Sequence, residues 1–297
     1  MNSILLVGAN GHIGSFLYNR LKNKFFVKTI SKNKNPNDPN ATTLDLRNLD
    51  DVKKFAINCE KYDQLIFLVG LAHKKGKRKQ LSDFNFVNLI TLKNLLCCLE
   101  SKNKVPEKII FASTISVYGH SMNRSRFVES SELNPSTPYA ITKLEAENYL
   151  KSTYPNKSWL LRFSPVYSNS FLININRRTK IGNLFYSIGD GGKMLSLCNM
   201  ENIGIVIDGI INNKVPSGIY NVSDKKNYFY KDLIKKQTPT HVIILPKFLL
   251  KLIYKLGSII DNNYLKENSI KLLTDNIYPS DKIRKNIDLP YDLNYIK

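Results

Sequence analysis

The sequence has no apolar run that approaches the roughly 18 residues needed to cross a membrane. It also leaves no room for the basic region and cleavage site of a secretory signal, because the apolar stretch Ile4–Val7 follows Met1 almost directly. We therefore expect a cytoplasmic protein without a membrane-spanning helix.

Cysteine is scarce, with four residues in a chain of 297. The four show no metal-type spacing, and the adjacent pair Cys97 and Cys98 lies in an apolar helical pattern, where thiols act as small hydrophobic groups. The sequence therefore predicts reduced cysteines in the core and no metal centre.

Acidic residues are few, because 24 Asp and Glu stand against 44 Lys and Arg, a formal net charge of +20. Such a balance suits an anionic partner, such as a nucleotide, a nucleic acid or an acidic membrane surface. The lysines, however, accompany abundant Asn and Ile along the whole chain, and no basic stripe interleaved with aromatic residues is evident. We attribute the charge to a composition bias and predict no nucleic-acid partner.

Strand and helix patterns alternate over the first 167 residues. The predicted strands are Ile4–Val7, Phe26–Ile30, Leu65–Val69, Lys108–Ala112 and Trp159–Phe163. The predicted helices are His12–Leu21, Leu49–Cys59, Phe84–Leu99 and Tyr139–Lys151. Strict alternation is typical of a parallel sheet with helices on both faces, so the pattern predicts an α/β protein with a Rossmann-type doubly wound sheet.

The alternation of strand and helix patterns becomes irregular beyond Tyr167. Ser168–Arg178 is polar and basic, like a linker, and Glu201–Ile211 and Ile219–Val222 are a further predicted helix and strand. Residues 225–297 are poorly periodic. We therefore predict a Rossmann domain over 1–167 and a smaller C-terminal substrate-binding lobe over 168–297, with parts near 201–223 returning to the first domain.

A glycine-rich loop joins the first predicted strand to the first helix. Glycine lets the backbone turn tightly and approach a pyrophosphate, whose charge then meets free N–H groups and the positive end of the helix dipole. The glycine spacing departs from the general G-x-G-x-x-G fingerprint. The loop nevertheless predicts a dinucleotide site, with contacts at Gly8, Asn10, Gly11, His12, Ile13 and Gly14.

The end of the second predicted strand bears on the choice of dinucleotide. An acidic residue usually binds the ribose 2′-hydroxyl of NAD there, and this chain has Ser31 and Lys32 instead. Both side chains suit a 2′-phosphate, which favours NADP. The alternative is that the Lys32 side chain is solvated and binds no cofactor. The cofactor is therefore predicted as NAD or NADP.

Two later segments carry groups suited to proton transfer. The fourth predicted strand leads into Ser113-Thr114-Ile115-Ser116-Val117-Tyr118-Gly119, and Tyr139 begins a helix twenty residues after Gly119. Lys143 lies four residues beyond Tyr139, so both side chains project from one helix face. A free phenol has a pKa of about 10, and a neighbouring ammonium favours the phenolate. The spacing predicts Tyr139 as an acid/base that Lys143 tunes.

The glycine loop, the segment after the fourth strand and the Tyr139/Lys143 pair, in this order, resemble the extended short-chain dehydrogenase/reductases of the NAD-dependent epimerase/dehydratase family. The resemblance implies hydride exchange between a nicotinamide and a sugar hydroxyl or ketone, with the proton carried by Tyr139 and the same oxygen bound by Thr114. It also implies cofactor contacts at Asp45, Leu46, Leu68, Val69, Gly70, Asn88 and Lys143.

The chain departs from the family pattern in its substrate contacts. Dehydratases of the family carry Asp-Glu after the threonine, whereas this chain has Ile115-Ser116, so dehydration is not expected. Pro165 and Leu195 occupy places where family members usually contact the sugar nucleotide. Arg177 and Arg178 are predicted to bind the diphosphate instead, because guanidinium groups suit it, and solvated surface arginines are the alternative.

The favoured function is an epimerase that acts at C4 of a hexose in a nucleotide sugar. Lys32 favours an NADPH-dependent 4-keto-sugar nucleotide reductase as an alternative. A third reading, a non-catalytic dinucleotide-sensing protein, conflicts with the presence of Tyr139 and Lys143. The resemblance further implies a homodimer through the helices near 84–99 and 139–151.

Residues 247–256 form a basic amphipathic pattern with lysines four residues apart. Such a helix suits peripheral contact with an anionic membrane. The alternative, which we favour from the sequence, is a helix of the smaller lobe with its apolar face in the core and its lysines in water.

Overall fold

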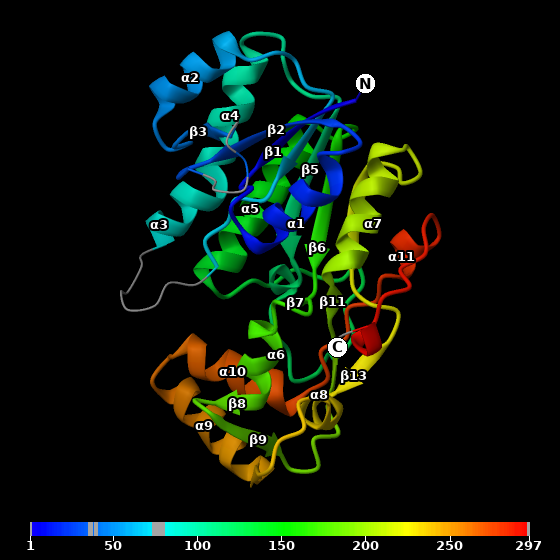
Figure 1. Ribbon diagram of the computed structural model, residues 1–297. Coiled ribbons are helices and arrows are strands. Elements are labelled where there is room, and N and C mark those ends of the chain that lie inside the picture. The colour runs from blue at the N-terminus through cyan, green and yellow to red at the C-terminus, as the bar shows by residue number, and fades with distance from the viewer. Residues whose placement is uncertain (1, 35–37, 39–40, 73–80, 296–297) are drawn as a thin grey trace. The chain divides into compact units, whose positions relative to one another are not determined.

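The structure is a computed structural model that describes residues 2–34, 38, 41–72 and 81–295 (Figure 1). The chain forms two compact units, which alternate along the sequence. The first unit comprises residues 1–114, 138–161 and 210–219, and the second comprises 115–137, 162–209 and 220–297. The division at residue 167 stays a prediction.

A seven-stranded sheet has the strand order β12-β6-β5-β4-β1-β2-β3. Its strands are β1 (Ser3–Val7), β2 (Phe26–Ser31), β3 (Thr42–Thr43), β4 (Gln64–Phe67), β5 (Lys108–Thr114), β6 (Ser158–Phe163) and β12 (Gly218–Val222). Neighbouring strands run parallel from β5 through β4, β1 and β2 to β3. The predicted α/β fold class is confirmed.

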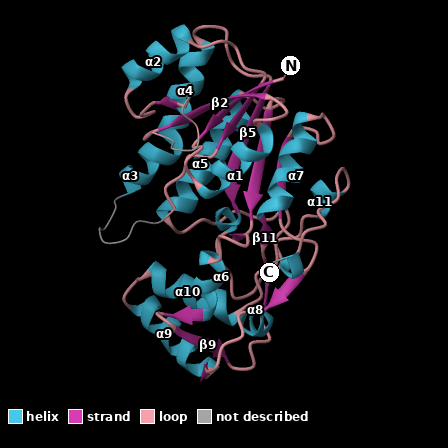
Figure 2. Cartoon of the chain, in the orientation of Figure 1, coloured by secondary structure: helices cyan, strands magenta, loops and turns pink. Residues whose placement is uncertain are grey.

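The helices of the first unit lie against the faces of this sheet (Figure 2). They are α1 (His12–Leu21), α2 (Leu49–Asn58), α3 (Leu81–Asn85), the π-helical turn η1 (Phe86–Ile90), α4 (Thr91–Glu100) and α5 (Pro138–Thr153). Every strand and helix predicted over residues 1–167 forms near its predicted place. The helix expected over 84–99 contains the π-helical turn, which holds Asn88.

Alternation along the strands builds the core of the first unit. Val7, Phe67 and Phe111 point to one face of the sheet and pack with the buried faces of α2, α4 and α5. Adjacent strand residues such as Leu6 are also fully buried, on the opposite face. Burial on both faces explains why these strands read as continuous apolar runs.

The second unit is made of short elements. They are η2 (Ile115–Tyr118), β7 (Val166–Tyr167), α6 (Ile173–Thr179), β8 (Lys180–Ile181), β9 (Leu184–Ile188), β10 (Met194–Ser196), β11 (Cys198–Asn199), α7 (Met200–Ile211, which ends in the first unit), β13 (Asn227–Phe229), α8 (Tyr230–Lys236), β14 (Val242–Leu245), α9 (Lys247–Ile259), α10 (Asn263–Leu273), α11 (Asp281–Arg284) and η3 (Leu293–Tyr295). The expected linker over 168–178 thus contains α6, and the poorly periodic segment 225–297 contains four helices. Most of the missed elements have two to seven residues, which is too short to show a period; the eleven-residue helix α10 was missed as well.

The cysteines differ in part from the prediction. All four are free, but Cys97 is exposed and Cys59 only half-buried, while Cys98 and Cys198 are buried. Cys97 lies on α4 toward solvent, where its Sγ is 3.7 Å from the Tyr149 hydroxyl. Among the described residues, none of the helices combines the length and apolar composition that crossing a membrane requires.

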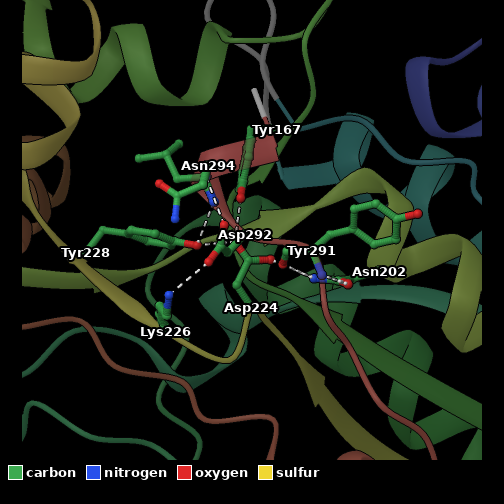
Figure 3. Close-up of polar contacts among 9 residues, drawn as sticks. Tyr167, Asn202, Asp224, Lys226, Tyr228, Tyr291, Asp292 and Asn294 are labelled. Carbon is green, nitrogen blue, oxygen red and sulfur yellow. Dashed lines mark hydrogen bonds and ion pairs between the residues drawn. The ribbon is translucent and has the colours of Figure 1, made fainter. Parts of the chain in front are cut away.

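A buried carboxylate, Asp224, joins several elements of the second unit (Figure 3). It accepts hydrogen bonds from the hydroxyls of Tyr167 and Tyr228, at 2.6 and 2.8 Å. It also accepts from the Asn199 backbone N–H at 2.7 Å and from the Asn202 side-chain amide at 2.9 Å. These four donors come from β7, β11, α7 and β13.

The same cluster holds the C-terminal segment. The Asn202 amide donates to the Tyr291 carbonyl at 2.7 Å, and the Leu293 N–H donates to the Tyr228 hydroxyl at 3.1 Å. Burial raises the pKa of Asp224 to about 6, although the hydrogen bonds to its carboxylate act in the opposite direction. A charged carboxylate so enclosed is stable only while its donors stay in place.

We expect Asp224 to make the stability of the second unit fall as the pH rises. Its folded-state pKa lies above the ordinary value of 3.8, so its contribution is complete below pH 3.8 and is lost as the pH rises through about 6. The free energy of unfolding of the wild type, relative to Asp224→Asn, should decrease by about 2 kcal/mol between pH 4 and pH 7. Urea unfolding at a series of pH values measures this difference.

Asp232→Asn is the matched control, because Asp232 is an exposed acid of the same unit. The wild-type and Asp232→Asn curves should stay parallel over the same range. A difference between wild type and Asp224→Asn that does not change with pH would refute the prediction.

Candidate functional site

The glycine loop has the backbone geometry that a phosphate cradle requires. Gly8 has a φ of +91°, which other residues rarely adopt. A Cβ at Gly14 would lie 2.3 Å from the Gly8 carbonyl oxygen, so only glycine fits there. Gly11 precedes α1 in an extended conformation, and no side chain caps the helix. The loop leads into the N-terminus of α1, which begins with His12 and Ile13, and the positive end of the helix dipole there favours an anion, so the loop fits a dinucleotide.

Hydrogen bonds join this loop to the end of β2. The Ser31 hydroxyl donates to the Asn10 side-chain oxygen at 3.1 Å. The Asn10 amide donates in turn to the carbonyls of Asn33 and Lys34, at 3.0 and 3.3 Å. The structure thus brings together Asn10 and Ser31, two residues predicted separately, and engages the Ser31 hydroxyl within the protein.

Lys32 and Asp45 also lie together, 3.5 Å apart. The Arg47 guanidinium binds the same carboxylate and holds the pKa of Asp45 well below its usual range. Lys32 therefore faces an ionised carboxylate, which partly neutralises its charge. Leu46, the next predicted contact, is buried in the core, and its carbonyl accepts from Asn94 at 3.1 Å.

Lys143 is a buried charged group of the first unit, with 2% of its surface exposed. Its Nζ donates to the carbonyls of Ala112 and Val69, at 2.9 and 3.2 Å, and lies 4.5 Å from the centre of the Phe111 ring. Burial lowers the pKa of Lys143 to about 7, while the charge of Glu147 acts in the opposite direction. The charged and neutral amine are therefore close in free energy at neutral pH.

Tyr139 lies one helical turn before Lys143 on α5. Burial raises the pKa of Tyr139, and a side-chain hydrogen bond with Thr114 lowers it. Thr114 is the last residue of β5 and is itself buried. The structure therefore places the three predicted catalytic residues at the end of one strand and in the first two turns of one helix.

Asn88 links the turn after β4 to α5. Its side-chain oxygen accepts from the Leu71 N–H at 2.6 Å, and its amide donates to the Thr142 hydroxyl at 2.9 Å. The turn itself contains Gly70, where a Cβ would lie 3.1 Å from Lys143 Nζ. Leu68, at the start of the turn, donates its N–H to the Val7 carbonyl at 2.9 Å, which holds the turn beside the glycine loop.

Glu147 was not predicted as a site residue. It is fully buried one turn after Lys143, and the Ser113 hydroxyl donates to it at 2.5 Å. Its charge favours the ammonium form of Lys143. The i, i+4 spacing from Lys143 was visible in the sequence, but the approach of Ser113 from β5 was not.

Arg177 and Arg178 differ in their surroundings. Arg177 is exposed, whereas Arg178 is partly buried and donates to the Asn174 carbonyl at 2.7 Å. Burial lowers the pKa of Arg178. Arg178 lines a small pocket of about 10 Å³ within the second unit, together with Tyr186, Ser187, Ile188, Gly191, Lys193, Tyr230 and Leu272. A space of this size has room for about one water molecule, so the pocket does not enclose a substrate.

Positive charge gathers near Arg178. Burial is the main cause that lowers the pKa of His120 to about 3, and the charges of Lys271 and Arg178 lower it further. Lys271 is partly balanced by Glu267, 3.5 Å away. An excess of cations around a partly buried pocket favours an anionic group.

Leu195 of β10 is buried in the core of the second unit, so it offers no polar contact. In the described part of the chain, no cluster of three or more His, Cys, Asp or Glu residues is arranged to bind a metal ion.

Comparisons with known proteins agree with this geometry. A sequence model of the NAD dependent epimerase/dehydratase family matches residues 4–221. The N-acetyl-alpha-D-glucosaminyl-diphospho-ditrans,octacis-undecaprenol 4-epimerase of Escherichia coli O157:H7 is 26% identical over 244 residues, which cover 78% of this chain and 70% of that protein. The UDP-glucose 4-epimerase 3 of Oryza sativa subsp. japonica is 28% identical over 167 residues, 50% of this chain and 44% of that protein.

A solved structure shows the same fold. The UDP-Glc/GlcNAc 4-epimerase of Campylobacter jejuni matches with a TM-score of 0.75 and 19% identity, over 99% of this chain and 96% of that one.

We expect Gly70→Ala to impair catalysis by displacing Lys143. The new Cβ would lie 3.1 Å from Nζ and 3.2 Å from Cε, so the amine must move away from the Val69 and Ala112 carbonyls. Turnover should fall by roughly tenfold or more, because small displacements of a positioned group cost large factors in rate. Steady-state kinetics measures the effect.

Urea unfolding of the same variant is the control: it should still unfold cooperatively, with a free energy of unfolding lowered by about 1–3 kcal/mol because the buried amine loses its carbonyl acceptors. Unchanged turnover in the folded variant would contradict the assigned position of Lys143.

Proposed function

Because the chain belongs to the NAD-dependent epimerase/dehydratase family, we propose that it is a cytoplasmic 4-epimerase acting on a hexose that is joined to a diphosphate. The observation that carries the proposal is that Tyr139 hydrogen-bonds to Thr114 at the end of β5, while Lys143, one turn further along α5, donates to the Ala112 carbonyl of the same strand. The cofactor is NAD or NADP, and the engaged state of Ser31 and Lys32 supports NAD.

The residues of the chain handle the proton of the 4-hydroxyl. A nicotinamide dinucleotide held by the glycine loop Gly8–Gly14 would supply the hydride chemistry at C4 that oxidation and reduction of the sugar require. Tyr139 Oη accepts the hydroxyl proton during oxidation and returns it during reduction, and Thr114 binds the same oxygen. The ammonium of Lys143 stabilises the phenolate, because a nearby positive charge lowers the pKa of a phenol.

The two other functions considered from the sequence have less support. A 4-keto-sugar reductase would exchange NADPH at each turnover, but Ser31 and Lys32, the groups suited to its 2′-phosphate, already bind Asn10 and Asp45. A non-catalytic sensing protein would have no need of the enclosed Lys143 or of its partner Glu147. The homodimer stays a prediction.

Arg178 is the proposed contact to the diphosphate, and Arg177 is not. Arg178 and Lys193 line the same pocket, where cations are in excess. The Oryza relative is named for a nucleotide sugar and the Escherichia coli relative for a sugar diphosphate on undecaprenol. The diphosphate is common to both. A nucleotide is the proposed carrier, and the exposed apolar side of α9 favours a polyprenol as the second candidate.

We expect Tyr139→Phe to lower turnover of a UDP-hexose by roughly 10²- to 10⁴-fold, because it removes the acid/base group. NAD content after purification should stay unchanged, since the glycine loop is intact. Analysis of the C4 epimers by NMR measures turnover, and added NADPH should not be consumed.

Tyr149→Phe is the matched control, because Tyr149 lies ten residues further along the same helix. It should turn over substrate like the wild type. Full activity of Tyr139→Phe would overturn the assignment, and net consumption of NADPH would favour the reductase.

We expect Arg178→Gln to raise KM for the sugar diphosphate by roughly tenfold or more with little change in kcat, because a charge-assisted contact is lost equally in ground and transition states. Arg177→Gln should leave both constants unchanged, since Arg177 is exposed. Equal effects of the two substitutions would show that neither arginine binds the diphosphate specifically.

A further inference from the structure

Helix α9 carries two apolar sides, of which the second unit uses only one. Leu250 is buried in a cluster with Tyr186 and Ile188 of β9, and Ile253 packs against it. Gly257 is buried, and a Cβ there would lie 3.0 Å from the Cβ of Leu265 on α10. This side of the helix faces the core, as the sequence predicted.

The opposite side is apolar and uncovered by the described residues. Its members are spaced four, four and three residues apart, so they form one row along the helix. Their exposed fractions are Phe248 69%, Leu252 50%, Leu256 49% and Ile259 79%. We call this row the α9 apolar row. The preceding strand β14 adds Ile243 and Ile244, which are 47% and 70% exposed.

A row of lysines runs beside the α9 apolar row. Lys247, Lys251 and Lys255 each precede a member of the row by one residue and are all exposed. The segment 242–260 contains these three lysines and no acidic residue. Asp190 pairs with Lys247 at 3.0 Å, which leaves Lys251 and Lys255 as the stronger sources of positive charge.

An exposed apolar row of this kind implies a partner, because single exposed apolar residues are common but contiguous ones are rare. A second copy of the chain is a poor fit. A symmetric contact through this face would bring two lysine-flanked faces together, and each chain carries a net charge of +20. Apolar side chains flanked by lysines match the acyl boundary and head groups of an anionic bilayer.

We propose that α9 docks on an anionic phospholipid bilayer, with the α9 apolar row in the acyl boundary and Lys251 and Lys255 on the lipid head groups. The docking itself does not depend on the reaction. The benefit of docking to the enzyme rests on the proposed function, since a bilayer would present a sugar diphosphate carried on a polyprenol.

Co-sedimentation with vesicles tests the docking in the absence of any sugar substrate. The full chain should bind vesicles that contain phosphatidylcholine and phosphatidylglycerol. It should bind vesicles of phosphatidylcholine alone much more weakly. High salt should release it, because salt screens the head-group contacts. Binding should fall by roughly tenfold or more in Phe248→Ser/Leu252→Ser and in Lys251→Gln/Lys255→Gln.

Matched variants elsewhere control for lost hydrophobicity and charge. Phe26→Ser/Ile57→Ser removes two apolar side chains that are 51% and 56% exposed, and Lys24→Gln/Lys54→Gln removes two exposed lysines. Both should bind vesicles like the wild type. Equal loss in the control and α9 variants would overturn the proposal, as would a dimer in light scattering that Phe248→Ser/Leu252→Ser dissociates.

Epimerisation of a soluble UDP-hexose separates this proposal from the function. The α9 variants should keep the wild-type rate, because they lie outside the residues assigned to catalysis. Vesicle binding without epimerisation of the UDP-hexose would uphold the docking and refute the nucleotide as the carrier. Epimerisation without vesicle binding would refute the docking alone.

Discussion

The buried ammonium of Lys143 is the interaction on which the arrangement of the site depends. An amine with so little exposure needs hydrogen-bond acceptors, and the carbonyls of Ala112 and Val69 provide them from the ends of two neighbouring strands. Gly70 leaves the space that the amine occupies, and Glu147 supplies a compensating charge. Because α5 is fixed to the sheet at this point, Tyr139 is held beside Thr114.

A buried charge organises the second unit as well, but with the opposite sign. Asp224 collects donors from four elements, β7, β11, α7 and β13, and three of these are strands of only two or three residues. The two groups respond to burial in opposite ways. Burial lowers the pKa of Lys143 toward neutrality, which suits proton transfer, and raises that of Asp224, which makes the unit sensitive to pH.

The large positive charge of the chain is used differently from place to place. Lys32 is balanced by Asp45, and Lys143 by Glu147. By contrast, cations exceed acids among the described residues in two places. One is the pocket near Arg178, and the other is the α9 apolar row. A general bias in composition therefore explains the amount of charge but not its distribution.

The sequence by itself determined the features that depend on local spacing. The strand and helix periods predicted the longer elements of residues 1–167, and the glycine positions predicted the loop before α1. The four-residue spacing placed Tyr139 and Lys143 on one helix face. These follow from backbone geometry within a few residues. The short elements after Tyr167 have no such period, and most of them escaped prediction.

Only the tertiary structure decided which distant residues meet. It placed Ser113 against Glu147 and Asn88 against Thr142, and it gathered the donors around Asp224. It also separated a partly buried Arg178 from an exposed Arg177, and it left one apolar side of α9 uncovered. No local pattern carries this information, because burial and long-range contacts depend on how the whole chain folds.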